Sequence, residues 1–324
     1  MVPASACFEP VPLQAVGARL RAARFAPDPA AGPRGVLVLL NGQTEFIEKY
    51  FEVIDELRRR GFAVVTMDWR GQGGSDRFLT DTRKGFVGNF HDYDEDLNTL
   101  YHWLVVPLLR KGEKPVALAH SMGGHNLLRY MVARPGSFAR CVLCAPMIRV
   151  SWRGQHEWLV RLVCAAQIRA GNGGGWVWGM EERDPLTMTF EKQIVTSDPE
   201  RFARTQAILR EDPDLRLAGA TWAWLAAALK SMDWLSAPGR PESIDTPLLL
   251  VGAGSDRICL TPATRAFAPR LPNGRYLEIA GAGHEILMER DLYRRQIWNA
   301  FDDFMGDFGK PPSGGYPGSV SQGE

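Results

Sequence analysis

The fold is indicated most strongly by the stretch LAHSMGG, residues 118–124. An apolar strand there ends on Ser121, and a helix predicted over residues 122–134 begins directly after it. Such a tight turn needs small residues two positions before and after the serine, and Ala119 and Gly123 meet that need. Ser121 is therefore a candidate nucleophile above the carboxyl end of a sheet, beside the free N–H groups of a helix. The alternative is a serine that only caps the helix.

Strands alternate with amphipathic helices on both sides of this stretch. GVLVLL is continuously apolar, as expected for a strand that is covered on both faces. In FIEKYFEVIDELRRRGF, which follows soon after, apolar residues recur at spacings of three and four, which is typical of an amphipathic helix. This alternation predicts an α/β fold with a mainly parallel central sheet and helices on both faces. The predicted strands span residues 35–40, 62–68, 116–121, 138–147, 246–256 and 275–284, and further helices are predicted at 92–110, 122–134, from 261 onward and at 291–308.

The alternation stops after Pro146 and resumes about a hundred residues later. Residues 148–245 look mostly helical or irregular, and they contain seven of the ten tryptophans. We predict that they form a cap inserted into a single α/β core, which comprises residues 1–147 and 246–309. The tail, residues 310–324, is rich in Pro, Gly and Ser and is predicted to be disordered.

A serine needs a base to become nucleophilic at neutral pH, and the chain order expected for this turn is serine, acid, histidine. Three histidines follow Ser121 in the chain, and the first, His125, lies only four residues on in the same predicted helix. His284, in GAGHEIL, is the better candidate because it comes at the end of the last predicted strand, whereas His156 lies in the predicted cap. Asp256, in VGAGSD, follows a strand and can orient the imidazole, whereas Asp245 precedes that strand at the wrong end of the sheet. The alternatives are a surface histidine and a plain turn aspartate.

The loop LLNGQTEF follows the first predicted strand and is a candidate for the oxyanion hole. One donor would be the backbone N–H of Met122, the residue after the candidate nucleophile, and the other would be the N–H of Gln43. Gly42 allows close approach of the backbone, and Asn41 could brace the loop. The alternative is a simple Asn-Gly turn.

Several other polar residues are assigned structural roles. The Gly-rich MDWRGQGGS is no dinucleotide fingerprint, because no G-x-G-x-x-G opens a helix there, and Asp68 and Arg70 are expected to tie loops together. His120 adjoins the serine and must point away from it. Glu285 and Glu289 follow the candidate base and are interpreted as loop or helix-cap groups.

Composition and charge exclude several classes of function. The chain has 324 residues, of which 23% are charged, and its net charge of +1 argues against a dedicated nucleic-acid binder. No cluster has metal-ligand spacing and no phosphate-binding loop is present, so no cofactor and no metal are expected. The five cysteines form no disulfide framework, and Cys141 and Cys144 would face opposite sides of a predicted strand. Buried thiols are predicted there, and not a redox pair.

The termini and the apolar runs bear on location. Neither a signal peptide nor an apolar run long enough to cross a membrane is apparent. We therefore expect a cytoplasmic protein, for which peripheral contact with the inner membrane stays open. The oligomeric state is not indicated.

The segments NGQTEFIEKYFEVIDELRRRGF, DWRGQGGSDR, GNFHDYDEDL, LAHSMGGHN and GAGHEILMERD occur in an order that resembles one known family. Together they are similar to the lysophospholipase and monoacylglycerol-lipase branch of the α/β hydrolases, and within it to bacterial lysophospholipases. The likeness runs from about residue 12 to residue 308 and implies the α/β-hydrolase fold. It implies a catalytic triad and an oxyanion hole at Ser121, Asp256, His284, Gln43 and Met122. The elbow alanine and the N-G-Q loop depart from the glycine and H-G that are commoner in this family.

The leading hypothesis is a serine hydrolase that cleaves carboxylic esters of lipid-like substrates, such as a lysolipid or another acyl ester, through an acyl-enzyme. An alternative is a serine aminopeptidase, since the same group includes enzymes with that label. Such an enzyme needs an acidic group for the substrate amino terminus, and the cap offers Glu157, Glu181, Glu182 and Asp184. A short-chain esterase is a further alternative, and a non-catalytic ligand-binding module is a remote one.

The cap composition favours an apolar substrate. Its tryptophans and leucines would wall an acyl pocket, where each buried methylene contributes about 0.8 kcal/mol. Basic residues are predicted near the pocket mouth, where one or two could face a lipid phosphate. The candidates include Arg149, Arg153, Arg161 and Arg169.

Overall fold

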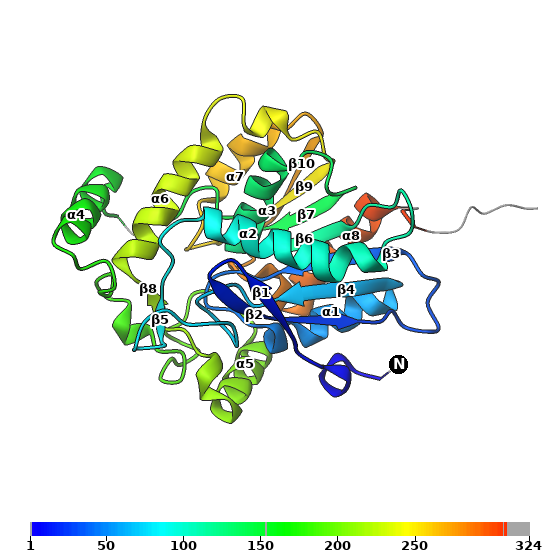
Figure 1. The fold of residues 1–324 in the computed structure, drawn as a ribbon, viewed down its shortest axis with the longest axis horizontal. Helices are drawn as coiled ribbons and strands as arrows, with labels where there is room; N and C mark the ends of the chain where they lie inside the picture. The colour runs from blue at the N-terminus through cyan, green and yellow to red at the C-terminus, as the bar shows by residue number, and fades with distance from the viewer. Residues whose placement is uncertain (1, 153, 307, 310–324) are drawn as a thin grey trace, which may run out of the picture.

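The computed structural model describes residues 2–152, 154–306 and 308–309 (Figure 1), so the predicted disordered tail lies outside the described residues. Its centre is one sheet of eight strands, of which the first three across the sheet pair antiparallel and the others parallel. This arrangement confirms the predicted mainly parallel sheet. In order across the sheet, the strands are β1 (Val11–Ala15), β2 (Ala18–Phe25), β4 (Phe62–Met67), β3 (Gly35–Leu40), β6 (Val116–His120), β7 (Cys141–Cys144), β9 (Leu248–Ala253) and β10 (Gly274–Ile279).

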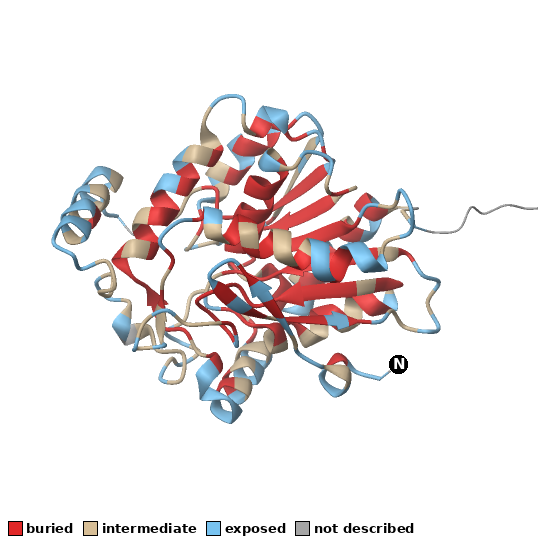
Figure 2. Ribbon diagram, in the orientation of Figure 1, coloured by how far each residue is buried: buried red, intermediate tan, exposed pale blue. Residues whose placement is uncertain are grey.

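Helices cover both faces of the sheet, and the sequence of β3 shows why. Val36 and Val38 belong to the apolar cluster on one face, while Leu37 and Leu39 belong to the cluster on the other. Since successive side chains of a strand point to opposite faces, a continuously apolar strand needs a helix layer on each side. Figure 2 shows the strands buried between these layers. One layer contains α1 (Phe51–Arg59) and α8 (Asp291–Met305), and the other contains α2 (His91–Leu100), α3 (Met122–Ala133) and α7 (Thr261–Phe267).

The same geometry bears out the prediction for two cysteines. Cys141 and Cys144 are fully buried at the two ends of β7, and their side chains lie in the clusters on opposite faces of the sheet. Both thiols are free. Burial raises the pKa of Cys144 to about 12, which makes this thiol a poor nucleophile.

Two details of the secondary structure differ from the sequence-based expectation. The β1–β2 hairpin was not expected, because its alternation is carried largely by alanine and arginine, which have low strand propensity. The helix predicted over residues 92–110 is α-helical only to Leu100. It continues as a π-turn, η3 (Tyr101–Val105), and a 3-10 turn, η4 (Val106–Leu108), in which Pro107 cannot donate a backbone hydrogen bond.

Residues 148–245 form three longer helices at the end of the sheet where the parallel strands finish (Figure 1). They are α4 (Glu157–Arg169), α5 (Pro199–Glu211) and α6 (Trp222–Ser236). A short strand of this segment, β8 (Gly219–Ala220), pairs with β5 (Lys84–Gly85) of the core. No described helix is both long and apolar enough to cross a membrane. The remaining short turns are η1 (Ala4–Cys7), η2 (Ile47–Tyr50), η5 (Glu181–Arg183), η6 (Pro213–Leu215), η7 (Pro241–Ser243), η8 (Ala268–Arg270) and η9 (Ile286–Met288).

A buried polar cluster attaches α6 to the core. The Ser231 hydroxyl lies 2.6 Å from Nε2 of His125 and accepts a hydrogen bond of 3.2 Å from Arg129. The Arg129 guanidinium also donates to both carboxylate oxygens of Asp94 on α2. Burial and the charge of Arg129 lower the pKa of His125 to about 3, so this imidazole stays neutral. The cluster therefore joins α2, α3 and α6 through satisfied hydrogen bonds.

Ion pairs attach α5 to the other side of the core. Arg201 binds both carboxylate oxygens of Glu52 on α1, at 2.9 and 2.7 Å. Arg294 of α8 binds the same carboxylate at 2.6 Å, as does Arg204 at 2.7 Å. Burial raises the pKa of Glu52, but the hydrogen bond from Arg201 and the charge of Arg294 outweigh it, and the pKa is about 2. The carboxylate thus stays ionised and continues to hold three arginines at neutral pH.

Candidate active site

Ser121 lies in the tight turn between β6 and α3, as the sequence predicted. Its backbone has φ 49° and ψ −116°, a conformation that non-glycine residues rarely adopt and that marks a strained turn. A Cβ atom on Gly123 would lie only 2.5 Å from the carbonyl oxygen of Asn41, so a side chain has no room there. Ala119 is fully buried within the sheet, where it pairs with Leu40 of β3. The alanine is therefore accommodated in place of the commoner glycine.

The three residues predicted to act together form one chain of hydrogen bonds. Nε2 of His284 lies 3.0 Å from Oγ of Ser121, and Nδ1 of His284 lies 2.7 Å from Oδ2 of Asp256. The other oxygen of Asp256 accepts the backbone N–H groups of Ile258 and Cys259 at 2.7 and 2.9 Å. Because both carboxylate oxygens are hydrogen-bonded, Asp256 is held in one orientation toward the imidazole. This is the geometry in which a histidine can take a proton from a serine.

Parallel strands explain how distant residues meet. Ser121 directly follows β6, Asp256 follows β9 by three residues, and His284 follows β10 by five. The last predicted strand was expected to reach His284, but β10 ends at Ile279 and the histidine lies in the loop beyond it. The carboxyl ends of parallel strands share one edge of the sheet, where ligands bind in α/β folds.

The loop after β3 packs directly on the serine. A Cβ atom on Gly42 would lie 3.2 Å from Cβ of Ser121. The carbonyl oxygen of Gly42 accepts a hydrogen bond of 2.7 Å from the side chain of Gln72, which also donates to the carbonyl of Glu45. A trans peptide directs its C=O and N–H in opposite directions, so Gln72 also sets the direction of the Gln43 N–H. Asn41 braces the loop through a hydrogen bond to the carbonyl oxygen of Met67.

A comparison with known families matches this architecture. A family model described as serine aminopeptidase, S33 matches residues 31–291. The chain belongs to the serine aminopeptidase S33 family. This result confirms the predicted likeness to α/β hydrolases.

Two curated relatives of this S33 family member carry the names of lipid hydrolases. Lysophospholipase L2 of Escherichia coli K12 is 29% identical over 283 residues, which cover 85% of this chain and 82% of that protein. A monoacylglycerol lipase of Mycolicibacterium smegmatis is 26% identical, over 81% of this chain and 85% of that protein. The match thus extends over most of each protein.

Solved structures confirm the α/β-hydrolase fold of the S33 chain. A soluble variant of monoglyceride lipase from Saccharomyces cerevisiae superposes with a TM-score of 0.75 at 18% identity, over 96% of this chain and 97% of that one. A carboxyl esterase from Bacillus coagulans superposes with a TM-score of 0.71 at 17% identity, over 93% and 98%. At such identities the likeness concerns the fold alone.

Sequence reasoning missed two residues of this S33 site, one that contacts Ser121 and one that holds the loop packed on it. Gln72 belongs to the Gly-rich loop that was expected to be structural, and its amide holds the loop after β3. Cys259 is buried with its Sγ atom 4.0 Å from Oγ of Ser121. Burial and then the charge of Asp256 raise the pKa of Cys259 well above its usual value, so the thiol stays protonated. Neither residue lies in a motif that distinguishes it from loop residues.

One group of described residues has donor atoms close enough together for a metal ion. Ligand atoms of Asp256, Cys259 and His284 lie within 4.8 Å of one another. Asp256 and His284 are already hydrogen-bonded to each other at 2.7 Å. The Cys259 thiol is protonated, whereas a metal ligand must be a thiolate. The donor set therefore fits a hydrolase triad better than a metal centre.

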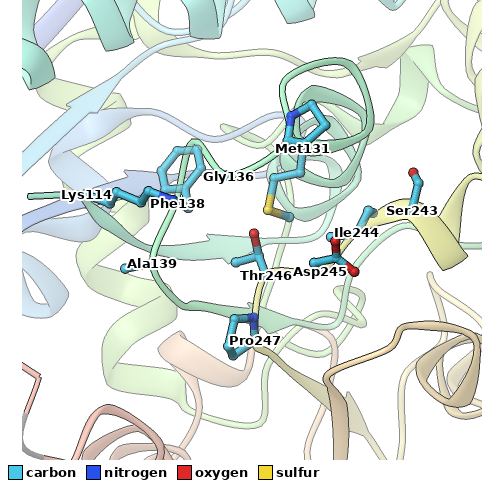
Figure 3. A pocket seen from close by; sticks show the side chains of 11 residues that line it. Lys114, Met131, Gly136, Phe138, Ala139, Ser243, Ile244, Asp245, Thr246 and Pro247 are labelled. Carbon is cyan, nitrogen blue, oxygen red and sulfur yellow. The ribbon is translucent and has the colours of Figure 1, made fainter. Parts of the chain in front are cut away.

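A cavity of about 430 Å³ opens at the opposite edge of the sheet (Figure 3). It is lined by residues that precede β6, β7 and β9, among them Lys114, Ala139 and Pro247. The three catalytic candidates follow the carboxyl ends of their strands. This cavity is therefore remote from the chemistry of the triad.

Proposed function

We propose that this enzyme hydrolyses carboxylic esters with a fatty-acyl part, as a lysophospholipase or monoacylglycerol lipase does, through an acyl-enzyme. The observation that carries the proposal is the hydrogen-bonded chain Ser121–His284–Asp256, with distances of 3.0 and 2.7 Å. The names of the curated relatives support the lipid part of the proposal.

Each of these residues has a role in the proposed reaction. His284 takes the proton of Ser121 as the hydroxyl attacks the ester carbonyl, and then donates it to the leaving alcohol. Asp256 holds the imidazole in the tautomer whose Nε2 can accept that proton. The N–H groups of Gln43 and Met122 stabilise the oxyanion, and loss of one such donor typically lowers kcat about 10²-fold. Water, activated by the same histidine, then releases the acyl group.

We propose that residues 148–245 act as the cap over this site. Three contacts of the segment surround the triad. The backbone oxygen of Val195 accepts a hydrogen bond of 2.8 Å from the residue after His284, and Val150 forms a β-bridge with Cys259. On the third side, β8 pairs with β5, where a Cβ atom on Gly85 would lie 3.3 Å from the side chain of Gln43. These contacts support the proposal that the segment covers the substrate.

Two of the four cap arginines that were expected near a lipid phosphate are already paired. Arg149 and Arg161 both bind Asp233, at 3.0 and 2.7 Å, so neither is free for a phosphate. Arg153 lies outside the described residues. Arg169 is exposed on the last turn of α4. The proposed ester specificity therefore depends on the acyl chain more than on an anionic headgroup.

We expect kcat/KM to rise with acyl chain length by about fourfold per methylene, the equivalent of about 0.8 kcal/mol, until the pocket is filled. The measurement is a series of lysophosphatidylcholines and a series of monoacylglycerols, each below its micelle concentration, with fatty acid release followed by mass spectrometry. A flat or falling series would replace the lipid proposal by a short-chain esterase. A rise in only one series would identify the headgroup.

The family description also names aminopeptidases, and the candidate carboxylates bear on that alternative. Glu157 is bound by Arg161 at 2.6 Å, and Asp184 has Arg83 and Arg216 within 4 Å. A carboxylate that already faces a guanidinium attracts a substrate amino terminus weakly. We therefore rank amide hydrolysis below ester hydrolysis. Faster cleavage of an aminoacyl amide than of the matched ester would reverse that order.

We further propose that α4 brings the enzyme to a lipid surface. Figure 1 shows α4 projecting from the body of the molecule beside α6. One side of α4 packs inward through Cys164, yet the outward side is also apolar, with Trp158 and Leu162 exposed by 65% and 58%. Its one carboxylate, Glu157, binds Arg161 of the same helix. A helix with an apolar outward face and no free carboxylate suits the interface of a bilayer better than water.

The double substitution Trp158→Glu and Leu162→Glu should weaken binding to phosphatidylcholine–phosphatidylglycerol vesicles about 10²-fold. The estimate counts about 1.5 kcal/mol for each buried side chain. Cosedimentation measures the binding. The matched control is Trp103→Glu with Leu292→Glu, an equally exposed pair on η3 and α8, which should bind as wild type does. Equal binding by all three proteins would refute the proposed surface, whatever the activity on monomeric esters.

A further inference from the structure

Four charged side chains are buried together behind the triad and form what we call the charge cluster: Glu45, Lys49, His120 and Glu285. Their side chains are 2%, 6%, 3% and 13% exposed. Lys49 binds Glu45 at 2.9 Å and Glu285 at 2.6 Å. Three loops meet here, namely the loop after β3, the turn that carries the nucleophile, and the loop that carries His284. The sequence had suggested no joint role for these four residues.

The partners of His120 define its protonation state. Nδ1 of His120 lies 3.0 Å from a carboxylate oxygen of Glu45, and Nε2 lies 3.1 Å from the backbone carbonyl oxygen of His284. A carbonyl oxygen can only accept a hydrogen bond. Glu45 is ionised as well, since it accepts hydrogen bonds from Lys49, from the Tyr50 hydroxyl at 2.7 Å and from a backbone N–H. Both nitrogens of His120 must therefore donate, which requires an imidazolium.

The charges of the cluster then balance, with two cations facing two carboxylates. Buried charges persist only when they are paired and hydrogen-bonded, and each member meets this condition. Burial lowers the pKa of His120, but the adjacent charge and hydrogen bond of Glu45 outweigh it and raise the pKa above its usual value. Burial likewise opposes ionisation of Glu45, yet Lys49 and His120 hold its pKa well below the usual range.

We propose that His120 is a positioning residue, protonated at neutral pH, that holds the loop after β3 (the oxyanion loop) and the catalytic base in register. Through Glu45 it reaches the N–H of Gly42, to which the same carboxylate oxygen binds. Through its other nitrogen it holds the backbone of His284, whose ring centroid is 4.8 Å away. The charged and titratable groups that face it are Glu45, Lys49, Glu285, Tyr50 and His284. The catalytic part of this proposal rests on the proposed hydrolase function, whereas the protonation state does not.

The protonation state can be measured in the intact enzyme without substrate. In protein labelled with ¹⁵N-histidine, both ring nitrogens of His120 should give the shifts of an imidazolium at pH 7. The signal is assigned by its absence in His120→Gln or, if that variant does not fold, in His120→Asn. A neutral tautomer of His120 at pH 7 would overturn the proposal. Because activity is not involved, this result is independent of whether the enzyme cleaves lipid esters.

The positioning role is tested by His120→Gln and Glu45→Gln. Displacement of catalytic groups by about an ångström can cost 10²-fold, so each variant should lower kcat about 10²-fold and leave KM within about threefold. The double variant should be no slower than the slower single one, because both changes break the same connection. Additive losses, or a folded His120→Gln with wild-type kcat, would overturn the proposal.

The matched control is Asp94→Asn, which breaks the buried carboxylate–arginine pair between α2 and α3, away from the triad. It should lower the melting temperature and leave kcat within about threefold, because a general loss of stability does not displace the oxyanion loop. If His120→Gln, like this control, lowers the melting temperature but leaves kcat within about threefold, His120 is only structural and the positioning role is refuted. In Ser121→Ala, activity should be lost while the imidazolium signal of His120 stays unaltered. That result would separate the proposed hydrolase function from the proposed protonation state of His120.

Discussion

Replacing Ser121 by alanine should lower kcat for a short nitrophenyl ester about 10⁶-fold, the loss typical of removing a triad nucleophile. The Ser121 hydroxyl lies 3.0 Å from Nε2 of His284, to which it can pass its proton. Alanine has no oxygen atom that can attack the ester and form the acyl-enzyme. Alanine keeps the Cβ atom of serine, so the substitution adds no strain to the backbone at this position. Activity should therefore fall while the melting temperature changes little.

Labelling by a fluorophosphonate probe checks the same assignment without turnover. Wild type should label once per chain, and Ser121→Ala should not label. The matched control is Ser137→Ala, which removes a buried hydroxyl that has no hydrogen-bond partner in the structure. Full labelling of Ser121→Ala would mean that the nucleophile is another residue and would refute the triad.

Replacing Asp256 by asparagine should lower kcat about 10⁴-fold at neutral pH. The oxygen that accepts the N–H groups of Ile258 and Cys259 fixes how the new side chain must sit, because only the amide oxygen can keep those two bonds. The amide NH₂ then faces Nδ1 of His284 and donates to it. The imidazole must carry its proton on Nε2, where it can no longer accept the proton of the serine.

The asparagine variant should keep its fold and bind a non-hydrolysable ester analogue as wild type does. Asp245→Asn is the matched control, since Asp245 is exposed before β9 at the opposite edge of the sheet and should be neutral for kcat. A loss smaller than tenfold in Asp256→Asn would mean that another carboxylate orients the base. The protein offers Glu285 and Glu289 in the same loop as the first candidates to examine.

The bonding of these two glutamates shows where local reasoning stopped. Both had been interpreted as loop or helix-cap groups because they follow His284. Glu285 instead pairs with Lys49 in the charge cluster, and Glu289 is fully buried, where it binds the N–H of Gly283 and the hydroxyl of Ser197. Lys49 and Ser197 lie 236 and 92 residues away from these glutamates in the chain, and nothing in the neighbouring sequence indicates them.

Asp68 and Arg70 had been expected to tie loops together, and they do. Asp68 is fully buried against Arg21 and the N–H of Ile47, and Arg70 binds Asp96 at 2.6 Å. Burial raises the pKa of Asp68 to about 6 against the opposing charge of Arg21. The residue types indicated that the loops are tied, but the partners on other elements could only be found in the structure.

The sequence by itself determined the order of the parallel strands and their helices, though not the β1–β2 hairpin, and it determined the turn at Ser121 and the identity of Asp256 and His284 as its partners. Those inferences succeed because apolar periodicity and small residues in a tight turn act over a few neighbours, and because parallel strands bring their carboxyl ends to one edge. Tertiary structure alone decided that His120 joins Glu45 to the backbone of His284, across 75 and 164 residues of chain. It also decided that Gln72 orients the oxyanion loop. Such pairings depend on how whole elements pack. The sequence around a buried polar side chain does not indicate which distant residue will be its hydrogen-bond partner.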